Sequence, residues 1–186
     1  MALFDVLSIV LIVIWKKEFI KEEWLLFIHE SKRSKTKKFL WLIPYYLLSA
    51  VLNGICSRVI DIQILSEPMN ESGLDALQFS GNLWISTIIT ILIVILAPII
   101  EEVVFRLGLF KPLSRKSKVL AYIISSMAFG LLHVLGPVVD GYPSQMWYII
   151  PYGISGFFYA KYYEKCGNIY YPIILHSFSN IIASIL

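Results

Sequence analysis

One stretch of the chain places charged side chains inside a long apolar run. Residues 83–113 are mostly apolar, yet they contain Glu101, Glu102 and Arg106. A charge within a membrane-spanning helix costs about 2.5–3.5 kcal/mol on insertion scales. We therefore expect these residues to have a catalytic role and not a stabilising one. A helix over the whole run would be roughly 46 Å long, which is too long for one straight span. Pro98 is therefore expected to kink or divide it.

Composition indicates an integral membrane protein. Hydrophobic residues make up 58% of the 186 residues and charged residues 16%, against roughly 45–50% and 25% in soluble domains. Several spans of about 20 residues with short loops use up this length, so we expect a single domain. The predicted fold is all-α, a polytopic membrane helix bundle. The net charge of +3 gives little support to nucleic-acid binding.

Apolar runs predict about six transmembrane helices. They cover residues 2–15, 39–60, 83–113, 119–135, 144–162 and 170–186. An acidic loop follows the second run and contains Asp61, Glu67, Glu71 and Asp75. Between the first two runs, residues 16–38 are highly charged but carry apolar residues at helical spacing, which predicts an amphipathic helix lying at the cytoplasmic interface.

The positions of Lys and Arg predict the orientation in the membrane. Eight of these residues lie between residues 16 and 38, and five lie between residues 106 and 118. The positive-inside rule places such segments in the cytoplasm. We therefore expect a multi-pass protein of the cell membrane, of bacterial plasma-membrane type, with an extracytoplasmic N-terminus.

Polar residues on three of the predicted helices fall at similar depths. Glu102 and Arg106 share one helix face at i,i+4, while Glu101 points about 100° away from that face. The later helices carry His133, and His176 with Asn180 four residues further on. Counted from the basic flanks, Glu101, His133 and His176 lie at depths of about 21, 22 and 16 Å. The three helices are thus expected to build one site near the middle of the bilayer.

Such a set of side chains supports two kinds of hydrolytic chemistry. A buried carboxylate and an imidazole can activate a water as general base, while other polar groups stabilise an oxyanion. Alternatively, Glu101, His133 and His176 are ligand types that suit Zn²⁺, with a metal-bound water as nucleophile. The residue types are compatible with both mechanisms, and in the second one Zn²⁺ would be the cofactor.

Three motifs in order carry a family resemblance. They are Glu101-Glu102-x-x-x-Arg106, Phe129-x-x-x-His133 and His176-x-x-x-Asn180. Together they resemble the CAAX protease and bacteriocin-processing family of intramembrane proteases, also called the Abi family. The resemblance implies a catalytic core over residues 83–186, preceded by N-terminal transmembrane helices and the amphipathic segment over residues 1–82, within one membrane domain.

The resemblance also implies roles for individual residues. Glu101 and His133 would activate the water, His176 and Asn180 would form the oxyanion hole, and Glu102 and Arg106 would support the site. The expected substrate is a small hydrophobic peptide or a membrane-anchored protein. Family membership at this chain length favours bacteriocin self-immunity or peptide maturation over processing of prenylated proteins.

Two alternatives from other classes remain. Gly153-Ile-Ser155-Gly156 matches the Gly-x-Ser-Gly pattern of rhomboid serine proteases, with His176 as a candidate partner for Ser155. That interpretation leaves Glu101, Glu102 and His133 without a function. A non-catalytic membrane protein of the same fold, acting in immunity or signalling, is the other alternative. Close helix packing is the simplest use for Gly153 and Gly156.

Overall fold

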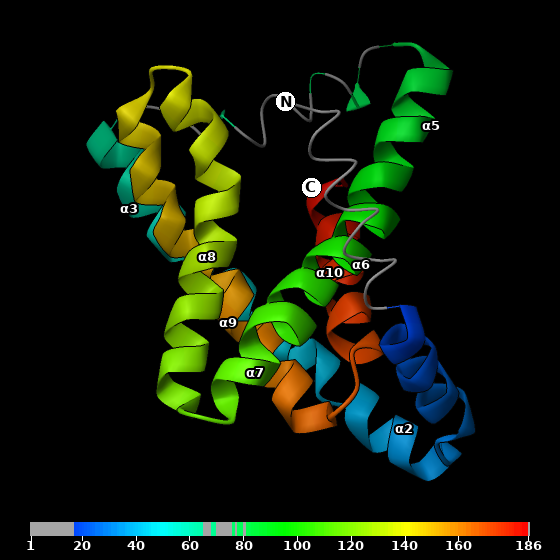
Figure 1. Ribbon diagram of the computed structural model, residues 1–186. Helices are drawn as coiled ribbons and strands as arrows, with labels where there is room; N and C mark the ends of the chain where they lie inside the picture. The colour runs from blue at the N-terminus through cyan, green and yellow to red at the C-terminus, as the bar shows by residue number, and fades with distance from the viewer. Residues whose placement is uncertain (1–16, 65–67, 70–75, 77, 80, 186) are drawn as a thin grey trace.

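The computed structural model describes residues 17–185 apart from 65–67, 70–75, 77 and 80 (Figure 1). These residues form helices and contain no strand, so the predicted all-α fold is confirmed for the described part of the chain. The predicted span over residues 2–15 lies outside the described residues. So do Glu67, Glu71 and Asp75 of the predicted acidic loop.

Most of the described helices follow one another with short connections, apart from the 18 residues between α3 and α5. In chain order they are α2 (Lys32–Phe39), α3 (Leu42–Ile64), α5 (Leu83–Ile91), η1 (Leu92–Leu96), α6 (Ala97–Glu102), η2 (Val103–Phe110), α7 (Lys111–Ser114), α8 (Lys118–Val139), η3 (Pro143–Tyr148), α9 (Ile149–Cys166) and α10 (Tyr170–Ala183). Of these, η1 and η2 are π-helical and η3 is a 3₁₀-helix. Residues 17–29 are also helical.

Five of the six predicted spans correspond to helices in the described residues. Three of these helical stretches are long and apolar enough to cross a membrane, at Lys32–Gln63, Leu83–Ser114 and Lys118–Val139. The last two predicted spans correspond to α9, which follows the short 3₁₀-helix η3, and to α10. The chain is therefore an all-α membrane helix bundle.

The long run with the acidic pair is one continuous helical stretch, and Pro98 does not divide it. Proline has no N–H and removes one bond from the helical ladder. Helix η1 precedes Pro98 and accommodates this loss by widening, so that Ala97 N–H bonds to Leu92 O five residues back. The π segments η1 and η2 flank α6, which carries Glu101 and Glu102. Sharp bends and π-bulges are common where a helix builds a functional site.

The amphipathic helix predicted within residues 16–38 is present at residues 17–29, and a second helix, α2, follows it. Ser31 separates them, and its side chain caps α2 by accepting a hydrogen bond from Ser34 N. In the first helix Leu26 is 65% exposed, as expected for a side chain facing lipid. Glu23, on another face, is only 5% exposed and accepts a hydrogen bond from Ile169 N. This helix therefore docks onto the start of α10 as well as facing the membrane interface.

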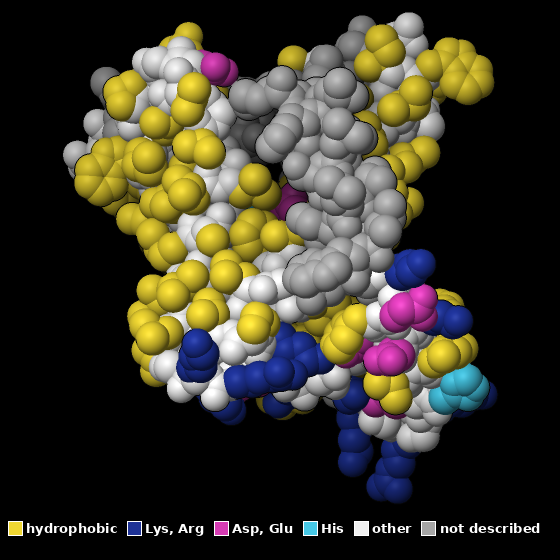
Figure 2. Space-filling view, in the orientation of Figure 1, with side chains coloured by type: hydrophobic (Ala, Val, Ile, Leu, Met, Phe, Trp, Pro, Cys, Tyr) yellow, Lys and Arg dark blue, Asp and Glu magenta, His cyan; other side chains and the backbone are white. Residues whose placement is uncertain are grey.

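The bundle opens like a V in Figure 1. Helices α3, α8 and α9 form one arm, α5 and α10 form the other, and the arms converge toward α6 and α7. Figure 2 shows the Lys and Arg side chains gathered at the end of the molecule that contains α2 and α7, while hydrophobic side chains cover most of the remainder. The basic end is the one that the positive-inside rule assigns to the cytoplasm, and that orientation remains a prediction.

Glycines bring α8 and α9 into close contact. A Cβ added at Gly156 would lie 2.9 Å from Phe129 Cβ, and one added at Gly153 would lie 3.4 Å from Ser126 O. The predicted packing role of these two glycines is confirmed. The closest approach, however, involves Gly130 on α8, where an added Cβ would lie 2.4 Å from Ile149 O.

We expect Gly130→Ala to destabilise the protein by at least about 2 kcal/mol, within the range of about 1–3 kcal/mol for overpacked cores. The cause is a clash with backbone at Ile149, which cannot rotate away as a side chain can. Gly136→Ala on the same helix is the matched control, since an added Cβ there meets nothing within 4 Å. Thermal unfolding in detergent measures both variants. Equal unfolding temperatures for the two would contradict the packing described here.

Candidate active site

A buried ion pair forms the base of the site. Glu102 and Arg106 are each 0% exposed. Arg106 donates from Nε to Glu102 Oε2 at 2.7 Å and from Nη2 to Glu102 Oε1 at 3.2 Å, the bidentate geometry expected for i,i+4 neighbours. Arg106 Nη1 also donates to Ser125 Oγ at 2.9 Å, which links the pair to α8. Sequence reasoning missed Ser125, which no motif marks.

Glu101 lies outside this ion pair, as its helical phase predicts. Its Oε2 atom is 3.8 Å from His133 Nε2 and 4.0 Å from His176 Nε2. The same oxygen is buried and has no hydrogen-bond partner among the described residues. An unpaired buried carboxylate oxygen costs about 1–3 kcal/mol or more, so its presence points to a bound water or a substrate group.

Both histidines are held by their Nδ1 atoms. His133 Nδ1 lies 2.9 Å from Phe129 O, and a carbonyl oxygen can only accept, so Nδ1 carries the hydrogen. His176 Nδ1 likewise donates to Glu102 Oε1 at 3.2 Å. In a neutral imidazole Nε2 is then a hydrogen-bond acceptor. The two Nε2 atoms face Glu101, so three acceptor atoms converge on one small volume.

Aromatic side chains fix the planes of the two imidazoles. Tyr152 stacks on His133 with ring centroids 4.6 Å apart, and Tyr159 stacks on His176 with centroids 4.5 Å apart. The two tyrosines are seven residues apart on α9 and so lie on one helix face. Sequence reasoning missed both, although their seven-residue spacing on one helix was an available signal. Phe129 of the second motif contacts both imidazoles from α8.

Asn180 has a structural contact that sequence spacing did not reveal. Ile93 O would pair with the N–H of residue 97 or 98, but Ala97 N–H bonds to Leu92 O and Pro98 has no N–H. Asn180 Nδ2 donates to the Ile93 carbonyl, which has no backbone partner in the helix, at 2.9 Å. Neighbouring helices often satisfy the backbone groups freed by proline in membrane helices. One amide hydrogen of Asn180 is thus used, and the second makes no hydrogen bond to the described residues.

A cavity of about 350 Å³ adjoins the two histidines. Helices α3, α8, α9 and α10 line it, and its residues are Tyr46, Ser49, Ala50, Asn53, Gly54, Ser57, Phe129, His133, Tyr152, Ser155, Tyr159, His176, Ser179, Asn180, Ile182 and Ala183. Of the candidate site residues, it brings together His133, His176 and Asn180. Among the described contacts, Ser155 Oγ accepts from Asn53 Nδ2 at 2.9 Å and makes no hydrogen bond to a histidine.

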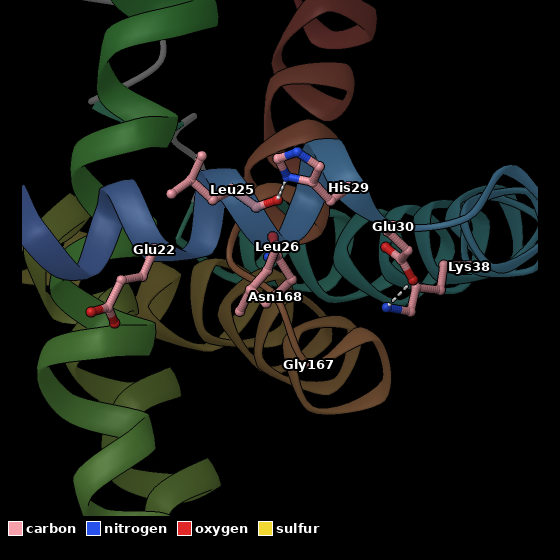
Figure 3. Close-up of a pocket in the computed structure, with 8 residues that line it drawn as sticks. All are labelled: Glu22, Leu25, Leu26, His29, Glu30, Lys38, Gly167 and Asn168. Carbon is pink, nitrogen blue, oxygen red and sulfur yellow. Dashed lines mark hydrogen bonds and ion pairs between the residues drawn. The ribbon is translucent and has the colours of Figure 1, made fainter.

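A second, more open hollow of about 770 Å³ lies at the basic end of the molecule. Figure 3 shows that the helix of residues 17–29, Glu30, Lys38 at the end of α2 and the turn at Gly167 and Asn168 form it. Glu30 there pairs with Lys38 at 2.6 Å. The hydrogen bonds from Lys38, Ser34 and Tyr171 outweigh partial burial and lower the pKa of Glu30. None of the candidate site residues lines this hollow.

The donor types of Glu101, His133 and His176 are those of a zinc site, but their spacing is too wide. Ligands at about 2.0–2.1 Å in a tetrahedron lie about 3.3 Å from one another. The two separations from Glu101 Oε2 are 3.8 and 4.0 Å. Among the described residues no group of three or more His, Cys, Asp or Glu side chains is arranged to hold a metal ion. The residues do not fit a zinc ion as they stand.

Comparison with known proteins identifies the family. The family model for the type II CAAX prenyl endopeptidase Rce1-like proteins matches residues 82–182, more than half of the chain. The chain belongs to this Rce1-like family. The matched region contains all of the candidate site residues. Membership supports a membrane location, in agreement with the apolar helices.

Two relatives extend beyond the matched region. An uncharacterized protein of Mycoplasma capricolum subsp. capricolum is 35% identical over 156 residues, which are 78% of this chain and 44% of that protein. The UPF0177 protein YxdF of Lactococcus lactis subsp. lactis is 28% identical over 177 residues, which are 95% of this chain and 88% of that protein. The chain thus spans less than half of the Mycoplasma relative. No solved structure matches the chain.

Proposed function

We propose that this Rce1-like protein is an intramembrane endopeptidase that hydrolyses a peptide bond with a water activated by Glu101 and His133. The observation that carries the proposal is the buried Glu101 Oε2, which lacks a hydrogen-bond partner and lies 3.8 Å from His133 Nε2. That distance is too long for a direct hydrogen bond but leaves room for a water about 2.8 Å from each atom. Both atoms are acceptors, so they would take the two hydrogens of this water.

The orientation of the water explains its reactivity. With both hydrogens directed at Glu101 and His133, an oxygen lone pair faces away from them, toward an incoming carbonyl carbon. Attack forms the C–O bond while one proton passes to Glu101. Glu101 then returns this proton to the leaving amine nitrogen as the C–N bond breaks. His133 keeps the tautomer set by its bond to Phe129 O throughout.

The negative charge on the carbonyl oxygen is stabilised by His176 and Asn180. Glu102 accepts from His176 Nδ1, and a protonated His176 keeps this bond while its Nε2–H donates to the oxyanion. The second amide hydrogen of Asn180 is the other donor. Glu101 is protonated in this state, so Glu102 and the oxyanion balance Arg106 and protonated His176, which leaves no net charge buried at the site. Glu102 and Arg106 support the histidine and do not contact the substrate.

Purified full-length protein in lipid vesicles tests the proposal against the zinc alternative. We expect it to cleave a small membrane-associated peptide, and we expect the cleavage rate to persist after exhaustive chelation. Elemental analysis of the same preparation shows whether a metal is bound. Loss of cleavage on chelation, with recovery on adding Zn²⁺, would mean that Glu101, His133 and His176 act as ligands and would overturn the direct activation of water. Absence of cleavage from every membrane-associated peptide in a broad library would favour a non-catalytic role.

A further inference from the structure

The cavity beside the two histidines has an unusual lining for a space inside a membrane protein. Its wall on α3 includes Ser49, Asn53 and Ser57, which are four residues apart and share one helix face with small residues between them. Hydroxyl groups of Tyr46, Ser155 and Ser179 belong to the same lining. Among the described residues that line it there is no Lys, Arg, Asp or Glu. The lining thus combines many polar groups with a larger apolar area, and His133 and His176 are the side chains in it that can carry a positive charge.

Hydrogen bonds within this lining leave donors and acceptors at its surface. Ser57 Oγ donates to Asn53 Oδ1 at 3.2 Å, and Asn53 Nδ2 donates to Ser155 Oγ at 2.9 Å. Ser155 accepts the last of these hydrogen bonds, so its own O–H is still available as a donor. On α10, Ser179 Oγ donates to Leu175 O at 3.0 Å and also makes a side-chain hydrogen bond with Tyr159, while the lone pairs of Asn53 Oδ1 that Ser57 does not occupy are acceptors. Both kinds of group are thus present next to the candidate catalytic residues.

An apolar occupant would be penalised in this cavity. Each polar group that it covered without replacing its hydrogen bond to water would remain unsatisfied in a medium of low polarity. An isoprenyl chain has no groups to offer in exchange. A segment of peptide backbone with small polar side chains offers both donors and acceptors, and uncharged side chains avoid burying an unpaired charge.

We infer that this cavity binds an uncharged, polar and unlipidated peptide segment next to the scissile bond. The assignment rests on the proposed proteolytic function and adds a substrate class to it. The substrate is then held in the membrane by a hydrophobic part elsewhere in its chain, while the segment that enters the cavity is rich in Gly, Ser, Thr, Asn or Gln. A prenylated cysteine, the group named in the family description, is disfavoured at this position.

Binding to the full-length Glu101→Gln variant in detergent tests the assignment without turnover. The probes are three labelled peptides of equal length whose central residues are Gly, Ser and Asn, or Leu and Val, or the polar set with one S-farnesyl cysteine. Fluorescence anisotropy gives each Kd. We expect the polar peptide to bind at least about ten-fold more tightly than either of the others, since about one hydrogen-bonded contact accounts for such a factor.

Asn53→Leu, added to Glu101→Gln, is expected to remove most of this preference, because it interrupts the chain from Ser57 to Ser155. Thr87→Val is the matched control, a polar-to-apolar change at an exposed position on α5, and it should leave the preference intact. Equal or tighter binding of the apolar or farnesylated peptide would overturn the assignment, as would an unchanged preference in Asn53→Leu.

Cleavage by the wild-type chain is scored separately. A chain that prefers the polar peptide in binding but cleaves none of the three would contradict the proposed function and leave the cavity assignment standing. A chain that cleaves the farnesylated peptide fastest would support the proposed function and contradict the cavity assignment.

Discussion

Replacing Glu101 with Gln is expected to lower kcat for peptide hydrolysis by about 10²–10⁴-fold, the usual contribution of general acid–base catalysis. The side chain keeps its size, but an amide cannot take a proton from water and return it to the leaving amine. The substrate Kd should change little, because Glu101 is not among the residues that line the cavity. Single-turnover hydrolysis and peptide binding, measured on the same preparation, separate the two effects.

The control for this experiment is Glu22→Gln, at an exposed position in the helix of residues 17–29. It makes the same chemical change away from the site and should retain wild-type hydrolysis. Full hydrolysis by Glu101→Gln would exclude the proposed general base. Loss of hydrolysis in Ser155→Ala alone, with Glu101→Gln active, would instead support a serine protease.

Arg106→Met should produce the largest loss of stability. It removes the cation from a pair that is 0% exposed and leaves Glu102 with only His176 and the helix around it. Breaking a buried ion pair by removing one partner costs about 3–5 kcal/mol, because the remaining charge is desolvated. Hydrolysis should fall as well, since Glu102 would no longer hold His176 in one position. Thermal or denaturant unfolding in detergent measures the loss of stability.

A double variant distinguishes two costs: the loss of the attraction between Glu102 and Arg106, and the burial of Glu102 as an unpaired charge. Glu102→Gln combined with Arg106→Met removes both charges and should recover most of the lost stability, while the hydrolysis rate stays low. Arg115→Met provides the control, since Arg115 is exposed at the basic end of the molecule. If Arg106→Met unfolds at the wild-type temperature, the pair does not stabilise the fold as described.

Much of the local geometry follows from spacing along single helices. The i,i+4 relation of Glu102 and Arg106 predicts their ion pair, and the phase of Glu101 predicts its separation from that pair. Both are present in the structure. Such relations are fixed by the helical repeat, which even the π-helical segment after Glu102 does not disturb enough to part the two side chains.

The division of residues 16–38 into two helices was not predictable from apolar spacing alone. The apolar residues at helical spacing end at Ile28, and the side chain of Ser31 caps a second helix whose residues 32–38 are all polar or charged. Burial of Glu23 was also unexpected, because its partner Ile169 lies far along the chain at the start of α10. A charged residue in a basic, solvated segment gives no sign of such a contact.

The sequence by itself determined the class of protein, the approximate spans and the residue types at the candidate site. Hydropathy determines where a helix can cross a bilayer, and the free-energy cost of a buried charge identifies charged residues within a span as candidates for function. Only the tertiary structure decided how the site is assembled. The direction of the two Nε2 atoms, the stacking of Tyr152 and Tyr159, the bond from Asn180 to Ile93 and the polar wall on α3 all depend on contacts between helices. Those contacts depend on interhelical packing, here set by glycines between α8 and α9, and not on the repeat within any one helix.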